Sequence, residues 1–169
     1  MEKRNLTESE VRQNLIDAFE EVKTVVNKYE GRSRAGLMLG LQEIGATMQG
    51  FIGAYFPVAS NIIVINKTPL RRINETNPDL LKPYGFHLLL HEYIHALGFL
   101  NESVTRQKTY EISNKNFGSN HIITQLSTNI TKFFPNLIYP VNGYLPNDIT
   151  SKIEIINGFD KSNSEFYIT

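Results

Sequence analysis

Apolar residues near the start of the chain follow the spacing of a helix. They recur at steps of three and four residues, at Val11, Leu15, Phe19, Val22, Val26 and Tyr29. That spacing places them on one face of a helix. Thr7, followed three residues later by Glu10, is typical of a capping box, and Gly31 is a suitable stop. The pattern therefore predicts an amphipathic helix from Thr7 to about Gly31.

The next region has the pattern of a small sheet, and the chain then returns to helix. Residues 35–66 carry little charge, are rich in β-branched and aromatic residues, and are interrupted by glycines, which predicts short strands with residues 61–66 as the clearest. Further on, residues 102–116 predict a helix with Val104, Tyr110 and Ile112 on its inner side. A third helix is expected from near Asn120 to before Pro135, and residues 152–157 alternate weakly, like a strand. The predicted fold class is α+β.

One polar triplet interrupts an otherwise apolar helix. Residues 86–97 are largely apolar, yet they contain His91, Glu92 and His95. Residues four apart lie on one face of a helix, so both imidazoles can reach one Zn²⁺ ion, while Glu92 can take a proton from a metal-activated water. The alternative is that both histidines are hydrogen-bonded core residues and Glu92 lies at the surface. Burying three such groups without partners is costly, which favours the metal.

Residues 91–98, with the sequence HEYIHALG, resemble the active-site helix of the zincin metallopeptidases, in which a glycine often ends the helix. Residues 53–57 and 61–66 resemble the zincin strand that comes before that helix. The resemblance implies a zincin-like fold and a compact, single-domain zinc peptidase, similar to small archaeal and bacterial zincins. In such an enzyme Glu92 is the general base. Asn101 stands where the metzincins have their third histidine, so the third zinc ligand must come from elsewhere.

Three residues are candidates for the third ligand. His121 is preferred, because it follows a glycine stop and would begin a helix able to fold back on the active-site helix. Glu111 is the alternative, on the helix after the motif, although the gap from His95 is shorter than in zincins with a glutamate ligand. Glu102 is nearer still, at the turn, where capping or orientation is its expected role. His87 is not expected to bind the same ion, because His87, His91 and His95 span about 12 Å of helix axis.

A peptidase also needs a donor for the oxyanion that forms during hydrolysis. The candidates are His87, Tyr93, Arg106, Tyr110, Tyr139 and Tyr144. The expected substrate is a peptide or an unfolded protein segment. A second function remains open, in which the chain is a catalytically silent, zincin-fold module for metal binding or regulation.

Composition limits the partners and the metal ligands. Lys plus Arg and Asp plus Glu number 17 each, which gives no electrostatic case for nucleic acid or an anionic membrane. Cysteine is absent, so the ligands must be histidine or carboxylate. No apolar run approaches the roughly 18 residues of a membrane span, and we expect a cytoplasmic protein. The length of 169 residues is consistent with one domain covering residues 1–169.

The last part of the chain, residues 133–169, interleaves aromatic residues with prolines, as in Phe134-Pro135 and Tyr139-Pro140. One interpretation is that it wraps the domain and buries its own aromatics. The other is that it covers the active-site cleft of its own or a neighbouring molecule, which would permit self-association. In the second case, removing residues 133–169 should leave a folded and more active peptidase.

Overall fold

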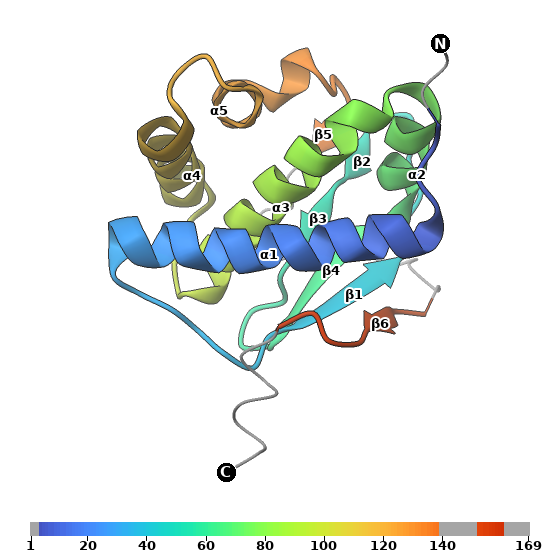
Figure 1. Ribbon diagram of the computed structural model, residues 1–169. Coiled ribbons are helices and arrows are strands. Elements are labelled where there is room, and N and C mark those ends of the chain that lie inside the picture. Colours follow the sequence, from blue (N-terminus) through green and yellow to red (C-terminus); the bar gives the residue numbers. More distant parts are fainter. Residues whose placement is uncertain (1–3, 139–151, 161–169) are drawn as a thin grey trace.

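The structure, a computed structural model, describes residues 4–138 and 152–160. Its elements follow one another in the order helix, strands, helices and, last, two short strands (Figure 1). The helices are α1 (Glu8–Glu30), α2 (Lys67–Thr76), α3 (Leu81–Ala96), α4 (Glu102–Phe117) and α5 (Ile122–Thr128), with 3₁₀ turns at Pro78–Leu80 and Ile130–Lys132. The strands are β1 (Met38–Gln42), β2 (Phe51–Ile52), β3 (Ala54–Tyr55), β4 (Ile62–Asn66), β5 (Leu137–Ile138) and β6 (Glu154–Ile156). This arrangement confirms the predicted α+β class.

Four of the strands form a mixed sheet in the order β3-β4-β1-β6. Strands β1 and β4 are parallel, with Leu39 opposite Ile63, whereas β3 and β6 pair antiparallel at the two edges. The short strands β2 and β5 pair separately and in parallel, with Phe51 opposite Leu137. Segments far apart in sequence, residues 51–52 and 137–138, therefore lie side by side.

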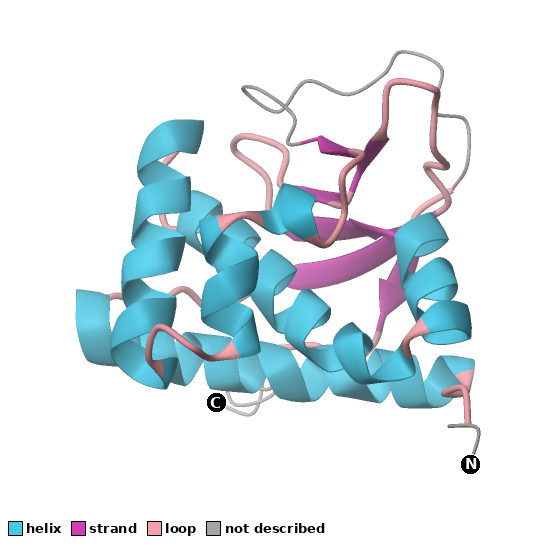
Figure 2. Cartoon of the chain, turned by 90° about the horizontal axis from the view of Figure 1, so that it is seen from above, coloured by secondary structure: helices cyan, strands magenta, loops and turns pink. Residues whose placement is uncertain are grey.

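The core lies between this sheet and the helices. Alternate residues of the two central strands are at most 3% exposed, namely Leu39, Leu41, Ile63 and Ile65. Because successive side chains on a strand point to opposite faces, all four belong to the sheet face that meets α1 and α3. Figure 2, seen from above, shows the long helix α1 running along this side of the sheet.

The first helix begins and ends as its sequence predicts. Thr7 accepts a hydrogen bond from the Glu10 amide at 3.2 Å, and the Glu10 carboxylate accepts one from the Thr7 amide at 2.8 Å. This reciprocal pair is the predicted capping box. At the other end Gly31 adopts a left-handed conformation with φ of 65°, which glycine tolerates without strain.

One local prediction needs correction, and one helix was not predicted. The inner face of α4 was predicted from Val104, Tyr110 and Ile112. Ile112 is buried, but Val104 and Tyr110 are 42% and 38% exposed. The other buried positions are Thr105, Thr109 and Ser113. Helix α2, which hydrophobic periodicity did not predict, begins at the Asn66 cap, whose side chain accepts from the Thr68 amide at 3.1 Å.

Some described residues of the C-terminal segment pack into the core, whereas others are exposed. Strand β6 is an edge of the sheet, and Phe159, 2% exposed, stacks on Phe19 with ring centroids 4.1 Å apart. Asp160 is buried and forms an ion pair with Lys23 at 2.6 Å. Removing residues 133–169 would take away these contacts, so the expectation that such a truncation stays folded conflicts with the structure. Tyr139-Pro140 and Tyr144 lie outside the described residues.

Candidate metal centre

Helix α3 carries the polar triplet into the protein interior. His91 and Glu92 are 1% and 3% exposed, and most of the helix is buried around them. Its last turn is held by Arg34, whose guanidinium donates to the Ala96 carbonyl and to the Ser60 carbonyl, both at 2.8 Å. A cation at a helix C-terminus also complements the partial negative charge of the free carbonyls there. The end of α3 is therefore fixed to the loop before β4.

A short reversal returns the chain to α3. Gly98, with φ of 108°, comes directly after the helix and adopts a backbone that L side chains rarely reach. Asn101 then caps α4 by accepting from the Val104 amide at 3.0 Å. Because α4 starts so soon, its first residue, Glu102, lies beside the histidines of α3.

Glu102 reaches both histidines of the motif. One carboxylate oxygen, Oε1, lies 2.8 Å from Nε2 of His91, and the other, Oε2, lies 3.0 Å from Nε2 of His95. The possible ligand atoms of His91, His95 and Glu102 all lie within 4.8 Å of one another. In the part of the chain that the structure describes, this is the one such group of three.

The orientation of His95 is set by the turn. Its Nδ1 lies 2.7 Å from the Phe99 carbonyl, and because a carbonyl only accepts, Nδ1 carries the hydrogen. Thr105 donates to the same carbonyl at 2.9 Å. A hydrogen bond of this kind on one ring nitrogen directs the other, Nε2, as a ligand. The Nε2 atom of His95 faces Glu102.

Charges in the cluster depend on one another. Burial opposes ionisation of Glu102, but hydrogen bonds from His91 and His95 outweigh it and bring the pKa of this carboxyl far below its usual range. Burial also lowers the pKa of His95, yet the hydrogen bond with Glu102 and the charge of Glu92 raise it overall. Burial raises the pKa of Glu92, which the positive charge of the two histidines partly opposes. The cluster thus favours the ionised form of Glu102 and the positively charged form of the neighbouring His95.

The donor set fits a zinc ion. Two imidazole nitrogens and one carboxylate oxygen are among the ligands that zinc prefers, and catalytic zinc sites use three protein ligands with a fourth position for water. A tetrahedral zinc with bonds near 2.0–2.1 Å would separate its ligand atoms by roughly 3.3 Å. The contacts at 2.8 and 3.0 Å, which the two different oxygens of Glu102 make with His91 and His95, are about 0.3–0.5 Å shorter than that separation.

No protein-family model, curated protein or solved structure matched this chain when it was compared with them. The site is therefore characterised by its own residues and geometry.

The two candidates that the sequence favoured over Glu102 lie elsewhere. His121 is exposed and caps α5, where its Nδ1 accepts from the Ile123 amide at 3.1 Å and its ring stacks on Phe117. Glu111 accepts from the Gln107 side chain at 3.0 Å on α4. Neither belongs to the group of possible ligand atoms. The geometry thus favours Glu102, the least preferred of the three candidates, for which the sequence predicted a capping or orienting role.

Only some of the candidate oxyanion donors that the structure describes lie near the cluster. The hydroxyl of Tyr93 is buried in the core, where it accepts from the Arg34 amide at 2.9 Å. Tyr110 lies on α4 at 38% exposure. His87 and Arg106 line a cavity that also includes His91. Among the described candidates, these two border a space next to the cluster, whereas Tyr139 and Tyr144 lie outside the described residues.

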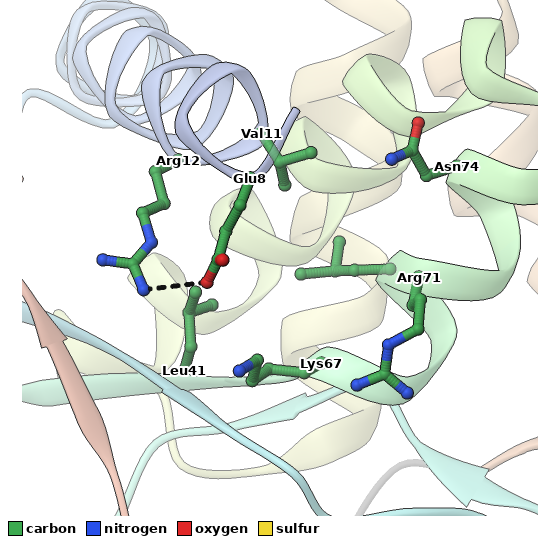
Figure 3. Close-up of a pocket in the computed structure, with 8 residues that line it drawn as sticks. Glu8, Val11, Arg12, Leu41, Lys67, Arg71 and Asn74 are labelled. Atoms are coloured by element: carbon green, nitrogen blue, oxygen red, sulfur yellow. Dashed lines mark hydrogen bonds and ion pairs between the residues drawn. The ribbon is translucent and has the colours of Figure 1, made fainter. Parts of the chain in front are cut away.

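A larger cavity, of about 340 Å³, lies away from the cluster, between the start of α1, the end of β1 and α2 (Figure 3). Its cations are each paired with a carboxylate. Arg12 contacts Glu8 and Glu154, both at 3.1 Å, Lys67 contacts Glu154 at 3.2 Å, and Arg71 pairs with Glu43. These ion pairs link α1, α2 and β6, which is a structural role.

Proposed function

We propose that the chain is a zinc-dependent peptidase of zincin-like fold in which His91, His95 and Glu102 hold the metal. The observation that carries the proposal is the contact of one carboxylate, Glu102, with both histidines of the polar triplet, His91 and His95, at 2.8 and 3.0 Å. Two histidines and one glutamate are a ligand set that catalytic zinc sites use, and hydrogen bonds in the turn between α3 and α4 position His95 and Glu102. The expected substrate is a peptide or an unfolded protein segment.

The residues of the site would share the chemistry in a simple way. Zinc, when bound, would act as a Lewis acid that activates a water and polarises the scissile carbonyl. Glu92 would accept the proton of that water and deliver it to the leaving amine. Its burial raises its pKa, which makes the carboxylate a stronger base than an exposed glutamate. His95 would keep its Nε2 directed to the metal because Nδ1 donates to Phe99.

Metal content tests the ligand set. Zinc would be measured by elemental analysis, after reloading and removal of excess metal, in wild type and in Glu102→Ala, His121→Ala and Glu111→Ala. We expect about one zinc per chain in the wild type and in the His121 and Glu111 variants, and weak or no binding in Glu102→Ala. Retention of zinc by Glu102→Ala together with its loss in the His121 variant would reject Glu102 as the ligand.

Turnover tests the reaction. Glu92→Gln keeps the size of the side chain and removes its basicity, so we expect zinc to stay bound while cleavage of an unfolded protein falls by at least about a hundredfold. The matched control is Glu111→Gln, which changes a glutamate outside the cluster and should leave the rate unchanged. A zinc-loaded wild type that cleaves nothing would favour the silent metal-binding module instead.

A further inference from the structure

A cavity begins at the proposed metal ligand His91. It has a volume of about 220 Å³ and lies between α3, α4 and the segment from α5 to β5. At about 30 Å³ for each water, this space equals about seven waters, which is enough for a side chain the size of glutamine. Because His91 forms part of the wall, a side chain that enters the cavity would belong to a residue next to the reacting carbonyl.

Hydroxyl groups line the cavity, and each already uses its hydrogen inside the protein. Thr109 donates to the Thr105 carbonyl at 2.7 Å. Ser127 and Thr128 donate to the Thr124 carbonyl at 2.7 and 2.9 Å. A carbonyl oxygen only accepts, so the one hydrogen of each hydroxyl is committed. These three hydroxyls therefore offer a ligand only their lone pairs, which accept hydrogen bonds.

Asn129 adds a donor to the same wall. Its side-chain oxygen accepts from the Thr131 hydroxyl at 2.6 Å, so its side-chain nitrogen is the group that can donate to a ligand. A ligand that matches this wall must donate to hydroxyl oxygens and accept from an amide nitrogen. A primary amide does both, because it carries two N–H donors and a carbonyl oxygen.

The charges around the cavity favour a neutral side chain. None of the described residues that line it is Asp or Glu, so an ammonium group there would lose its water without gaining a counterion. A carboxylate would face the hydroxyl lone pairs with no hydrogen to donate to them. Arg106 also borders the cavity, but its guanidinium is already engaged, by Glu102 at 3.5 Å and by a further interaction. The wall thus suits a neutral hydrogen-bond donor better than either ion.

We propose that this cavity is a side-chain subsite of the peptidase and that it selects a residue with a primary amide, glutamine or asparagine, beside the scissile bond. The proposal rests on the proposed function and adds its substrate class. The amide nitrogen of the substrate would donate to the hydroxyls of Thr109 and Ser127, and the amide oxygen would accept from Asn129. Its methylene groups would pack on Ile130 and Leu137, which are apolar residues of the wall.

The test uses synthetic peptides that differ only at the residues flanking one bond, which are Gln, Met, Glu or Lys. Methionine is close to glutamine in size but donates no hydrogen bond, so this pair isolates the amide. Cleavage by the zinc-loaded protein would be monitored by mass spectrometry, which also identifies the bond. We expect kcat/KM for the Gln peptide to exceed that for the Met peptide by roughly tenfold, the size of about one buried hydrogen bond, and to exceed those for the Glu and Lys peptides as well.

Two substitutions remove acceptors from the wall. Thr109→Val keeps the shape of the side chain and should reduce the preference for Gln over Met by about threefold or more, and Ser127→Ala should reduce it in the same direction. The matched control is Ser113→Ala. The Ser113 hydroxyl donates to the Thr109 carbonyl at 2.7 Å in the same helix but is not part of the cavity wall, so this variant should keep the wild-type preference.

Zinc content is measured in every variant, so that a change of specificity is separated from damage to the metal site. If a zinc-loaded and active wild type cleaves the Met, Glu or Lys peptide as fast as the Gln peptide, the subsite proposal is overturned and the proposed function stays intact.

Binding provides a measurement that does not depend on turnover. The Glu92→Gln protein, loaded with zinc, would be titrated with the Gln and Met peptides in a calorimeter. Tighter binding of the Gln peptide, with a smaller difference when Thr109→Val is added, would support the subsite even if the wild type cleaves nothing. Equal affinities, or tighter binding of the Met peptide, would overturn it.

Discussion

The buried histidine His87 leads to a prediction about stability and pH. It lies one helical turn before His91 and is 2% exposed. Burial, with a smaller contribution from the positive charge of His91, lowers its pKa from 6.5 to about 3. The unfolded chain therefore binds a proton at pH values where the native protein does not. Stability contributed by neutral His87 is complete above about pH 6.5 and decreases as the pH falls toward 3.

The size of the effect comes from the two pKa values. Between them the free energy of unfolding falls by up to about 1.4 kcal/mol for each pH unit. Relative to pH 7.5, the loss due to His87 is about 2 kcal/mol at pH 5 and approaches about 5 kcal/mol below pH 3. At pH 5 the native state holds almost no proton on His87, so the first figure depends only on the pKa in the unfolded chain.

The assay is urea unfolding of the metal-free protein at pH 7.5 and pH 5, in the presence of a chelator. The variant His87→Gln has a side chain that does not titrate in this range. Between pH 7.5 and pH 5 the free energy of unfolding of the wild type should fall by about 2 kcal/mol more than that of His87→Gln. This difference does not depend on how much the substitution destabilises the protein at pH 7.5. Glu92, His95 and Glu102 titrate in both proteins, so the difference between the two reports His87.

A matched control is His121→Asn, which also removes one histidine. His121 is exposed and caps α5, and asparagine keeps a side-chain acceptor for the Ile123 amide. Comparison with this variant shows whether loss of a histidine outside α3 has the same effect as His87→Gln. If wild type and His87→Gln lose the same free energy between pH 7.5 and pH 5, His87 takes up its proton in the native state and the reasoning from burial is refuted.

Two further predictions concern Arg34, which binds the end of α3, and Phe159 in the C-terminal segment. Arg34→Leu removes the charge-assisted hydrogen bonds to the Ala96 and Ser60 carbonyls and should lower the free energy of unfolding, measured by urea titration, by about 2–4 kcal/mol. Arg32→Leu, a nearby control, should lower it by less than about 1 kcal/mol. Phe159→Ala removes the ring stacked on Phe19 and should cost about 3–5 kcal/mol, with a lower thermal midpoint by calorimetry. A midpoint unchanged in Phe159→Ala would mean that the C-terminal segment is not part of the cooperative core.

Elements whose local signals agree with their environment could be predicted from the sequence. Helix α1 has an apolar stripe, a capping box and a glycine stop, and all three appear in the structure. Strand β4 was predicted to within one residue. The apolar helix around His91 was predicted near its C-terminal end, although α3 begins at Leu81, five residues before the predicted stretch. In each case the secondary structure that the residues prefer locally is also the one that buries their apolar side chains. Hydrophobic periodicity predicts secondary structure correctly when these two agree.

The inner face of α4 shows where that condition fails. The buried side chains Thr109 and Ser113 are polar, so a search for apolar residues passes over them. Each hydroxyl donates to the carbonyl one turn earlier in the same helix, at 2.7 Å. A hydroxyl satisfied in this way can be buried at little cost. Hydrophobic periodicity therefore selected Val104 and Tyr110, which lie toward solvent.

The position of Glu102 in the candidate site could not be found by the same reasoning, because two ordinary explanations compete for it. An acidic residue in the first turn of a helix is common, since it complements the partial positive charge there. Its approach to His91 and His95 depends instead on the backbone between the helices, where Gly98 turns the chain and Asn101 starts α4 within a few residues. A spacing of seven residues from His95 gives no sign of that reversal. The motif points to two candidate ligands, whereas the position of the third candidate, Glu102, depends on the turn between α3 and α4 and is seen only in the structure.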